Sequence, residues 1–207
     1  MTSSANSTRR FYEYHPDVNR FAAVEFASGP VYGTGDSSTV TDLHWRDEPV
    51  RDTWIPLKCD GFDGDPPKVG DFPSVNDYSK IPMMSERAWS VLEPIIGDAC
   101  EALPLMHPFP GTYYLIHVMQ TIDALDITAS DVEFLHDEDD DAYVADKRIW
   151  RIDRYAFKYD LIEGQHIFKL PLMSGSGLIV DDVFRKTVED RGLRGLRFKE
   201  LPLAEDR

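Results

Sequence analysis

The last forty residues constrain the fold most, because they contain a well-marked helix followed by an alternating strand. Asp181 can cap a helix, and Phe184 and Val188 fall on one face of that helix. Gly192 suits the position just after the helix end, where the backbone often turns left-handed. Residues 196–199 then alternate apolar and basic side chains, as half-buried strands do. From His166-Ile-Phe-Lys-Leu-Pro onwards, the tract therefore predicts a short strand, a capped helix and a closing strand.

Other segments predict strands and helices in mixed order. Tyr113–Met119 is almost entirely apolar and rich in β-forming residues, so we expect a central strand that is covered on both faces. Ser85 can cap a helix that ends at Pro94, and residues 99–105 follow as a strand. This order predicts the α+β class, with a mostly antiparallel mixed sheet and a few short helices packed on it.

Two regions predict local irregularity. The apolar residues of Ile149–Phe157 change face along the segment, with Trp150 and Ile152 on the first face, which indicates a bulge or a bend. The long stretch before residue 80 is dense in glycine, proline and aspartate. Within it we expect short strands, rather than helices, around Thr39–Trp45 and Trp54–Leu57.

The length of 207 residues is sufficient for one sizeable core. Residues 1–10 lack apolar periodicity and are expected to form a disordered tail. Residues 11–203 are expected to form a single α+β domain, with an N-terminal lobe (11–80) and a C-terminal lobe (81–203) as its natural division.

The charge is strongly acidic, with 37 aspartate and glutamate against 22 lysine and arginine residues, a net charge of −15. Nucleic-acid binding depends on basic residues, so it is disfavoured. The same charge suits a basic protein partner, or solubility alone. No apolar run is long enough to cross a membrane, and no secretion signal is seen. With only two, widely separated cysteines, we expect a cytoplasmic protein.

The sequence offers no convincing catalytic constellation. His117 lies in the apolar Tyr113–Met119 stretch and is better explained as a buried histidine with a hydrogen-bond partner than as a catalytic one. The other histidines are scattered without metal-ligand spacing. Ser176 lacks the glycine that a nucleophile elbow needs two residues earlier. We therefore expect no catalytic residues, no metal and no cofactor.

The acidic run Asp137–Asp141 has three interpretations. It is a solvated loop, a contact surface for a basic partner, or a source of oxygen ligands for Ca²⁺ or Mg²⁺. It lacks the spacing of an EF-hand loop, so the metal interpretation ranks third. Because the run carries five consecutive acidic side chains, it is a natural candidate for charge-steered binding.

Several motifs, taken in order, resemble one known family over roughly residues 60–201. These motifs are Lys68-Val69 with Asp71-Phe72, Ser85…Leu92-Glu93-Pro94, Leu103-Pro-Leu105, Tyr113-Tyr114-Leu115, Ile149–Phe157, the His166-Ile-Phe tract and Gly192-Leu-Arg-Gly-Leu-Arg-Phe198. Together they resemble the immunity proteins of bacterial polymorphic toxin systems, of the myxococcal type. The resemblance implies a non-enzymatic, cytoplasmic bacterial protein that blocks a cognate toxin, encoded by an adjacent gene.

The expected toxin-facing surface combines acidic side chains with aromatic anchors. It comprises Asp42, Trp45, Asp47, Glu48 and Trp54, together with Asp137, Glu138, Asp139, Asp140 and Asp141. The plain alternative is that both tryptophans are buried and the acidic residues are merely solvated. The alternative function is a small metal-dependent enzyme or acidic metal-binding domain using His117 or His136. A third is an acidic adaptor with several partners.

Overall fold

The computed structural model describes residues 9–26, 40–61, 68–75, 81–134, 149–171, 173 and 177–204. Within them, the strands are β1 (Phe11–Pro16), β2 (Ala23–Phe26), β3 (Leu57–Gly61), β4 (Ser74–Val75), β5 (Met83–Ser85), β6 (Cys100–Met106), β7 (Tyr113–Val118), β8 (Asp131–Phe134), β9 (Ile149–Arg154), β10 (Ile167–Lys169), β11 (Leu178–Asp181) and β12 (Leu196–Glu200). The helices are α1 (Glu86–Ile96) and α2 (Asp182–Asp190), with 3-10 helices η1 (Val40–Trp45), η2 (Arg51–Thr53) and η4 (Tyr159–Leu161).

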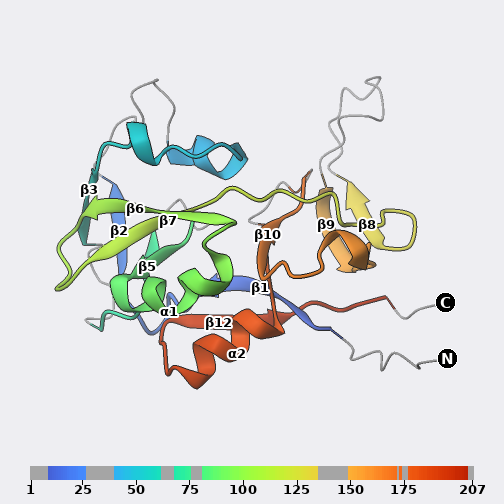
Figure 1. Ribbon diagram of the computed structural model, residues 1–207. Helices are drawn as coiled ribbons and strands as arrows, with labels where there is room; N and C mark the ends of the chain where they lie inside the picture. Colours follow the sequence, from blue (N-terminus) through green and yellow to red (C-terminus); the bar gives the residue numbers. More distant parts are fainter. Residues whose placement is uncertain are drawn as a thin grey trace.

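The strands form mainly antiparallel sheets, which confirms the predicted α+β class (Figure 1). One sheet has the order β4-β2-β3-β6-β7-β5, the second β10-β11-β1-β12, and β8 and β9 form a ribbon. Only the β2–β4 and β3–β6 pairs of these sheets are parallel. The predicted strand at Tyr113–Met119 is β7, which lies between β6 and β5 and is buried along nearly its whole length.

Both helices belong to the same kind of unit. Helix α1 connects β5 to β6, which flank β7 and run antiparallel to it. Helix α2 connects β11 to β12, which flank β1 in the same way. The N-terminal strand β1 therefore completes the sheet formed by the last residues of the chain. No helix in the described residues is both long and apolar enough to span a membrane.

Helix α1 begins as predicted and ends later than predicted. The Ser85 hydroxyl accepts a hydrogen bond from the Ala88 amide at 3.1 Å, which is the expected N-cap. The expected end at Pro94 is wrong, because the helix continues to Ile96. Proline removes one hydrogen bond and crowds the preceding turn, and burial of the Ile96 side chain, only 1% exposed, offsets that cost.

Helix α2 agrees with the prediction at both ends. The Asp181 carboxylate accepts from the amides of Val183 and Phe184, each at 3.0 Å. Phe184 and Val188 are buried. Gly192 has a φ of +59°, so a residue without a Cβ is needed there.

The predicted strand at Thr39–Trp45 is wrong, since residues 40–45 form η1. The tight helical turn directs Leu43 into the core and leaves Trp45 exposed, which a strand of alternating faces would not do. The predicted strand at Trp54–Leu57 is also misplaced. Arg51–Thr53 form η2, and the strand begins only at Leu57.

The bulge expected in Ile149–Phe157 is present, but its faces are assigned wrongly. In the β8–β9 ribbon Phe134 pairs with Ile149 and Glu133 with Arg151, so Trp150 is the extra residue. Trp150 is consequently 59% exposed and does not share the buried face of Ile152.

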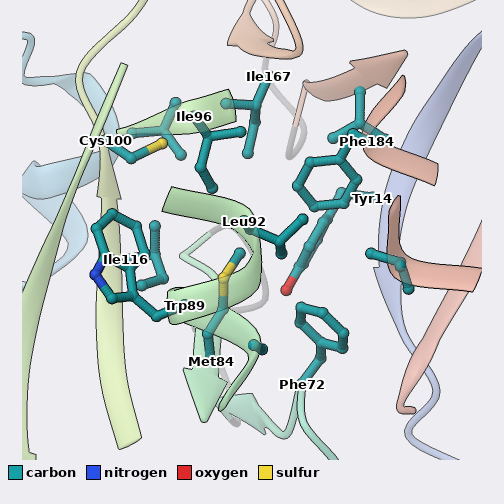
Figure 2. Packing of buried hydrophobic residues seen from close by; sticks show 14 of the residues in the cluster. Tyr14, Phe72, Met84, Trp89, Leu92, Ile96, Cys100, Ile116, Ile167 and Phe184 are labelled. Carbon is teal, nitrogen blue, oxygen red and sulfur yellow. The ribbon is translucent and has the colours of Figure 1, made fainter. Parts of the chain in front are cut away.

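The core divides into three clusters. The first surrounds α1, whose Trp89 and Leu92 lie between the six-stranded sheet and the elements carrying Tyr14 and Phe184 (Figure 2). The second covers the opposite face of the four-stranded sheet with β9 and the residues that follow it. The third lies on the outer face of the six-stranded sheet, beneath residues 43–57. This third cluster holds residues 43–57 against the sheet.

Candidate interaction site

Four of the ten residues predicted to face the toxin lie on residues 43–56, which we call the anchored segment. Trp45 is 55% exposed, and Asp47 and Glu48 are also exposed, whereas Trp54 is half-buried. Asp42 lies in η1, and its side chain is outside the described residues, as is the whole run Asp137–Asp141. The structure therefore brings Trp45, Asp47, Glu48 and Trp54 together on one segment.

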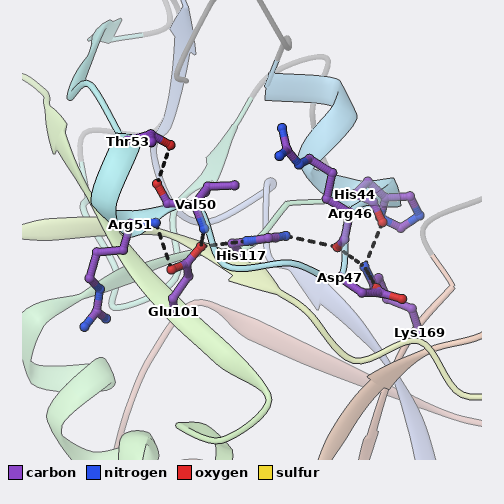
Figure 3. A network of polar contacts seen from close by, with 9 residues as sticks. All are labelled: His44, Arg46, Asp47, Val50, Arg51, Thr53, Glu101, His117 and Lys169. Carbon is purple, nitrogen blue, oxygen red and sulfur yellow. Dashed lines mark hydrogen bonds and ion pairs between the residues drawn. The ribbon is translucent and has the colours of Figure 1, made fainter. Parts of the chain in front are cut away.

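The Glu101 carboxylate fixes the middle of the anchored segment. One oxygen accepts from the Val50 amide at 2.6 Å, and the other accepts from the Arg51 amide at 3.1 Å (Figure 3). Glu101 projects from β6 and is only 5% exposed. A buried carboxylate bonded to two backbone amides holds the backbone in one position, because losing either bond leaves a polar group unsatisfied.

His117 on β7 links Glu101 to a second point of the segment. Its Nδ1 lies 2.9 Å from the Glu101 carboxylate and its Nε2 lies 3.1 Å from the Arg46 carbonyl oxygen. Both ring nitrogens therefore have a polar partner, and the ring links β6 to the anchored segment. The expectation of a buried, hydrogen-bonded histidine is confirmed.

Lys169 reaches the same segment from β10, an edge strand of the other sheet. Its ammonium donates to the carbonyl oxygens of His44 at 2.9 Å and Arg46 at 3.1 Å, and lies 3.1 Å from the Asp47 carboxylate. Burial lowers the pKa of Lys169, and the contact with Asp47 opposes that shift. Thr121 donates to the same Asp47 oxygen at 2.7 Å. Asp47 is thus held in place although it is half exposed.

Apolar contacts fix the remainder of the segment. Leu43 and Val50 are each 2% exposed and belong to the third core cluster, against which Trp54 packs. The Trp54 indole donates to the Pro104 carbonyl oxygen at 2.8 Å. The alternative in which both tryptophans are buried is therefore wrong for Trp45. Trp54 is half-buried, and its packing and hydrogen bond help to hold the segment.

Glu101 and Lys169 were not among the residues that the sequence predicts for the site. Each is a charged residue inside a predicted apolar strand, which was the available signal. Their partners are distant along the chain, from Val50 to Glu101 and from His44 to Lys169, so spacing could not reveal the pairing.

A groove separates the anchored segment from α1 and β6. Three adjoining cavities of about 520, 340 and 360 Å³ follow it. The first and second share Pro49, and the second and third share Arg51, Trp89 and Glu93. The groove therefore runs along the segment that carries the predicted binding residues.

His166 lines the largest of these three cavities and has a carboxylate partner. Its Nδ1 lies 2.9 Å from the Asp181 carboxylate, an arrangement that can orient a general base. Asp181 also caps α2, which explains the pair structurally. The described residues lining this cavity include no serine, threonine, cysteine or tyrosine to act as a nucleophile.

The cysteines are poor nucleophiles for a physical reason. Burial raises the pKa of the Cys59 thiol to about 11 and raises the pKa of the Cys100 thiol further. In the described part of the chain, no three histidine, cysteine, aspartate or glutamate side chains gather as a metal site would require. Since Asp137–Asp141 lie outside that part, the metal-dependent alternative stays a prediction.

Comparison with known families decides the class of the protein. The model of the immunity protein family Imm11 matches residues 65–202. The chain belongs to the Imm11 immunity protein family. No curated protein matches it. The resemblance inferred from the sequence motifs is thereby confirmed at the level of a toxin-immunity family.

The Imm11 match divides the site into two parts. Glu101, His117 and Lys169, which hold the anchored segment, lie within the matched residues. The anchored segment itself, residues 43–56, precedes them. The contacts that fix the segment therefore come from the part of the chain that defines the family.

Proposed function

We propose that this protein binds a cognate bacterial toxin and neutralises it by steric and electrostatic blocking, without chemistry of its own. Toxin immunity is the function that the Imm11 family suggests. The observation that carries the proposed mechanism is the anchoring of an exposed segment by three buried polar side chains, Glu101, His117 and Lys169. Immobilised binding segments lose less entropy when a partner docks, so they bind more tightly for the same contact area.

The exposed side chains on this segment suit a protein partner. Trp45 offers a large aromatic surface of the kind that dominates interface energies. Asp47 and Glu48, next to it, supply negative charge, which accelerates association with a basic surface. We propose the same contribution from Asp42 and from Asp137–Asp141. A net charge of −15 supports a basic toxin and argues against nucleic acid as the partner.

The anchored segment precedes the residues that match the family, which supports separate roles for the segment and the matched part of the chain. The matched framework supplies Glu101, His117 and Lys169, and the segment in front of it supplies the contact residues. We propose that the partner is encoded by an adjacent gene and that the complex forms in the cytoplasm.

Co-expression with the adjacent gene tests the function. The gene alone should arrest growth, this protein should restore growth, and the two products should co-purify. If the gene is not toxic, or this protein neither restores growth nor binds its product, the proposed function is wrong.

The role of Trp45 has a matched control in the same chain. Trp45→Ala should weaken toxin binding about tenfold or more, as expected for a central aromatic anchor. Trp150→Ala removes a tryptophan of similar exposure, 59%, that is not among the proposed contact residues, and it should weaken binding far less. Equal effects of both substitutions would place the interface elsewhere. Calorimetric titration against the purified toxin measures both.

A further inference from the structure

We infer that the groove between the anchored segment and α1 binds a cationic side chain, arginine or lysine, on a basic stretch of the toxin. The inference rests on the proposed function and extends it to the side of the groove that faces the anchored segment. That side consists of Glu93, Ile95 and Asp98 at the end of α1, together with His166.

The charges around the groove favour a cation. Asp52, Glu93 and Asp98 are exposed, and none of them forms an ion pair with another described residue. The basic groups that line the groove are Arg51 and His166. Glu101 also lines the groove, but His117 and two backbone amides already occupy its carboxylate, so it is not counted among the available acidic groups.

The end of α1 adds to the negative potential. Ile95 and Asp98 line the first of the three cavities and Gly97 lines the second, so the C-terminus of α1 opens into the groove. The carbonyl groups at a helix C-terminus carry partial negative charge, which a basic side chain in the last turn usually compensates. The last turn of α1 contains no basic residue. An incoming cation would supply the missing compensation.

The groove also provides apolar surface for the stem of such a side chain. Pro49, Ile95 and Met119 line the largest of the three cavities, and Trp89 and Trp54 line the one at the other end of the groove. Arginine and lysine bury their methylene groups against apolar surface while their charged ends meet polar groups. A guanidinium can in addition stack on an aromatic ring.

The first experiment uses a defined probe. Tetra-arginine amide is titrated into the full-length ¹⁵N-labelled protein, with tetra-citrulline amide as the neutral control of similar shape. We expect saturable chemical-shift changes concentrated at the backbone amides of Glu93, Asp98, Gln165 and Arg51 with the arginine peptide alone. Changes spread evenly over the acidic surface, or no changes, overturn the inference.

The second experiment uses the toxin. The double substitution Glu93→Gln, Asp98→Asn should slow association at low salt about tenfold and flatten its salt dependence. Glu86→Gln, Asp190→Asn removes the same charge from exposed positions outside the groove and should change the rate far less. If the wild type binds the toxin and both double variants associate equally fast, the groove assignment fails while the proposed function stands. If the wild type neither binds nor protects, the proposed function fails, and the peptide titration alone decides the groove.

Discussion

Glu101→Gln is the sharpest test of the anchoring, because it changes one buried group without changing its shape. The Glu101 carboxylate accepts from the Val50 amide, the Arg51 amide and His117. A glutamine has one acceptor oxygen, so its NH₂ group must face one of these donors. If the oxygen keeps Val50 and His117, the Arg51 amide loses its acceptor and meets another donor.

The expected cost follows from these contacts. An unsatisfied buried donor costs about 1–3 kcal/mol, and bonds to a charged acceptor weaken when the acceptor becomes neutral. Two effects reduce the total, since the neutral side chain is easier to bury and the Arg51 amide lies near solvent. We expect the free energy of unfolding to fall by about 2 kcal/mol, which for a chain of this size corresponds to a decrease in Tm of roughly 4–8 °C.

Urea denaturation and hydrogen exchange measure the two consequences. The denaturation midpoint should fall, and the amides of Val50 and Arg51 should exchange faster than in the wild type. Glu93→Gln is the matched control, since Glu93 lines the same groove but is exposed, and its cost should stay within about 0.5 kcal/mol. Equal stability of the two variants, with unchanged exchange at Val50 and Arg51, would refute the anchoring argument.

Three other substitutions or treatments test the fold. Tyr14→Phe should stabilise the protein by about 1 kcal/mol in urea denaturation, because the Tyr14 hydroxyl is buried without a partner among the described residues; a loss of stability would contradict this. Asp181→Ala should lower the free energy of unfolding by about 1–2 kcal/mol, since it removes the N-cap of α2. Asp181→Asn should retain most of the capping stability, because asparagine can also accept from these amides. Iodoacetamide at pH 8 should modify Cys59 only after unfolding, as mass spectrometry can show, because burial raises its pKa to about 11. Because burial disfavours the Cys59 thiolate, the contribution of this thiol to the free energy of unfolding is fully present below about pH 9. It is lost as the pH rises through 11.

Local signals in the sequence predicted the helices and the class of the fold well. The caps at Ser85 and Asp181 are short-range hydrogen bonds between neighbouring residues, so the sequence alone reveals them. The errors at residues 39–45 and at Pro94 have a common cause. In both places the burial of one side chain, Leu43 or Ile96, decides the local backbone, and burial depends on distant parts of the chain.

The pairing of the strands could not be predicted from the sequence, because it also depends on distant parts of the chain. Strand β1 lies between β11 and β12, which are formed at the other end of the chain. No local pattern in residues 11–16 indicates these partners. The expected division into lobes 11–80 and 81–203 stays a prediction, as does the disordered tail at residues 1–10.

The candidate site was predictable only in its exposed part. Trp45, Asp47 and Glu48 stand out in the sequence because aromatic and acidic residues occur together. The side chains that hold them, Glu101 and Lys169, come from β6 and β10 and could be identified only from the three-dimensional arrangement. Exposed aromatic and acidic residues can be recognised from the composition of their segment. The buried residues that hold them lie far away in the sequence and cannot be recognised in this way.

The energetic cost of the support indicates what it is for. Burying polar and ionisable groups such as Glu101, His117 and Lys169 is expensive, and well-packed apolar residues in such positions are often equally or more stabilising. The hydrogen bonds of these three side chains converge on the backbone from His44 to Arg51, rather than on the strands from which they project. Apolar replacements could fill the same volume, but they could not fix the orientation of carbonyl and amide groups in an irregular segment. The arrangement therefore uses buried polar groups where orientation matters more than stability, which is what the proposed role as a preformed binding segment would require.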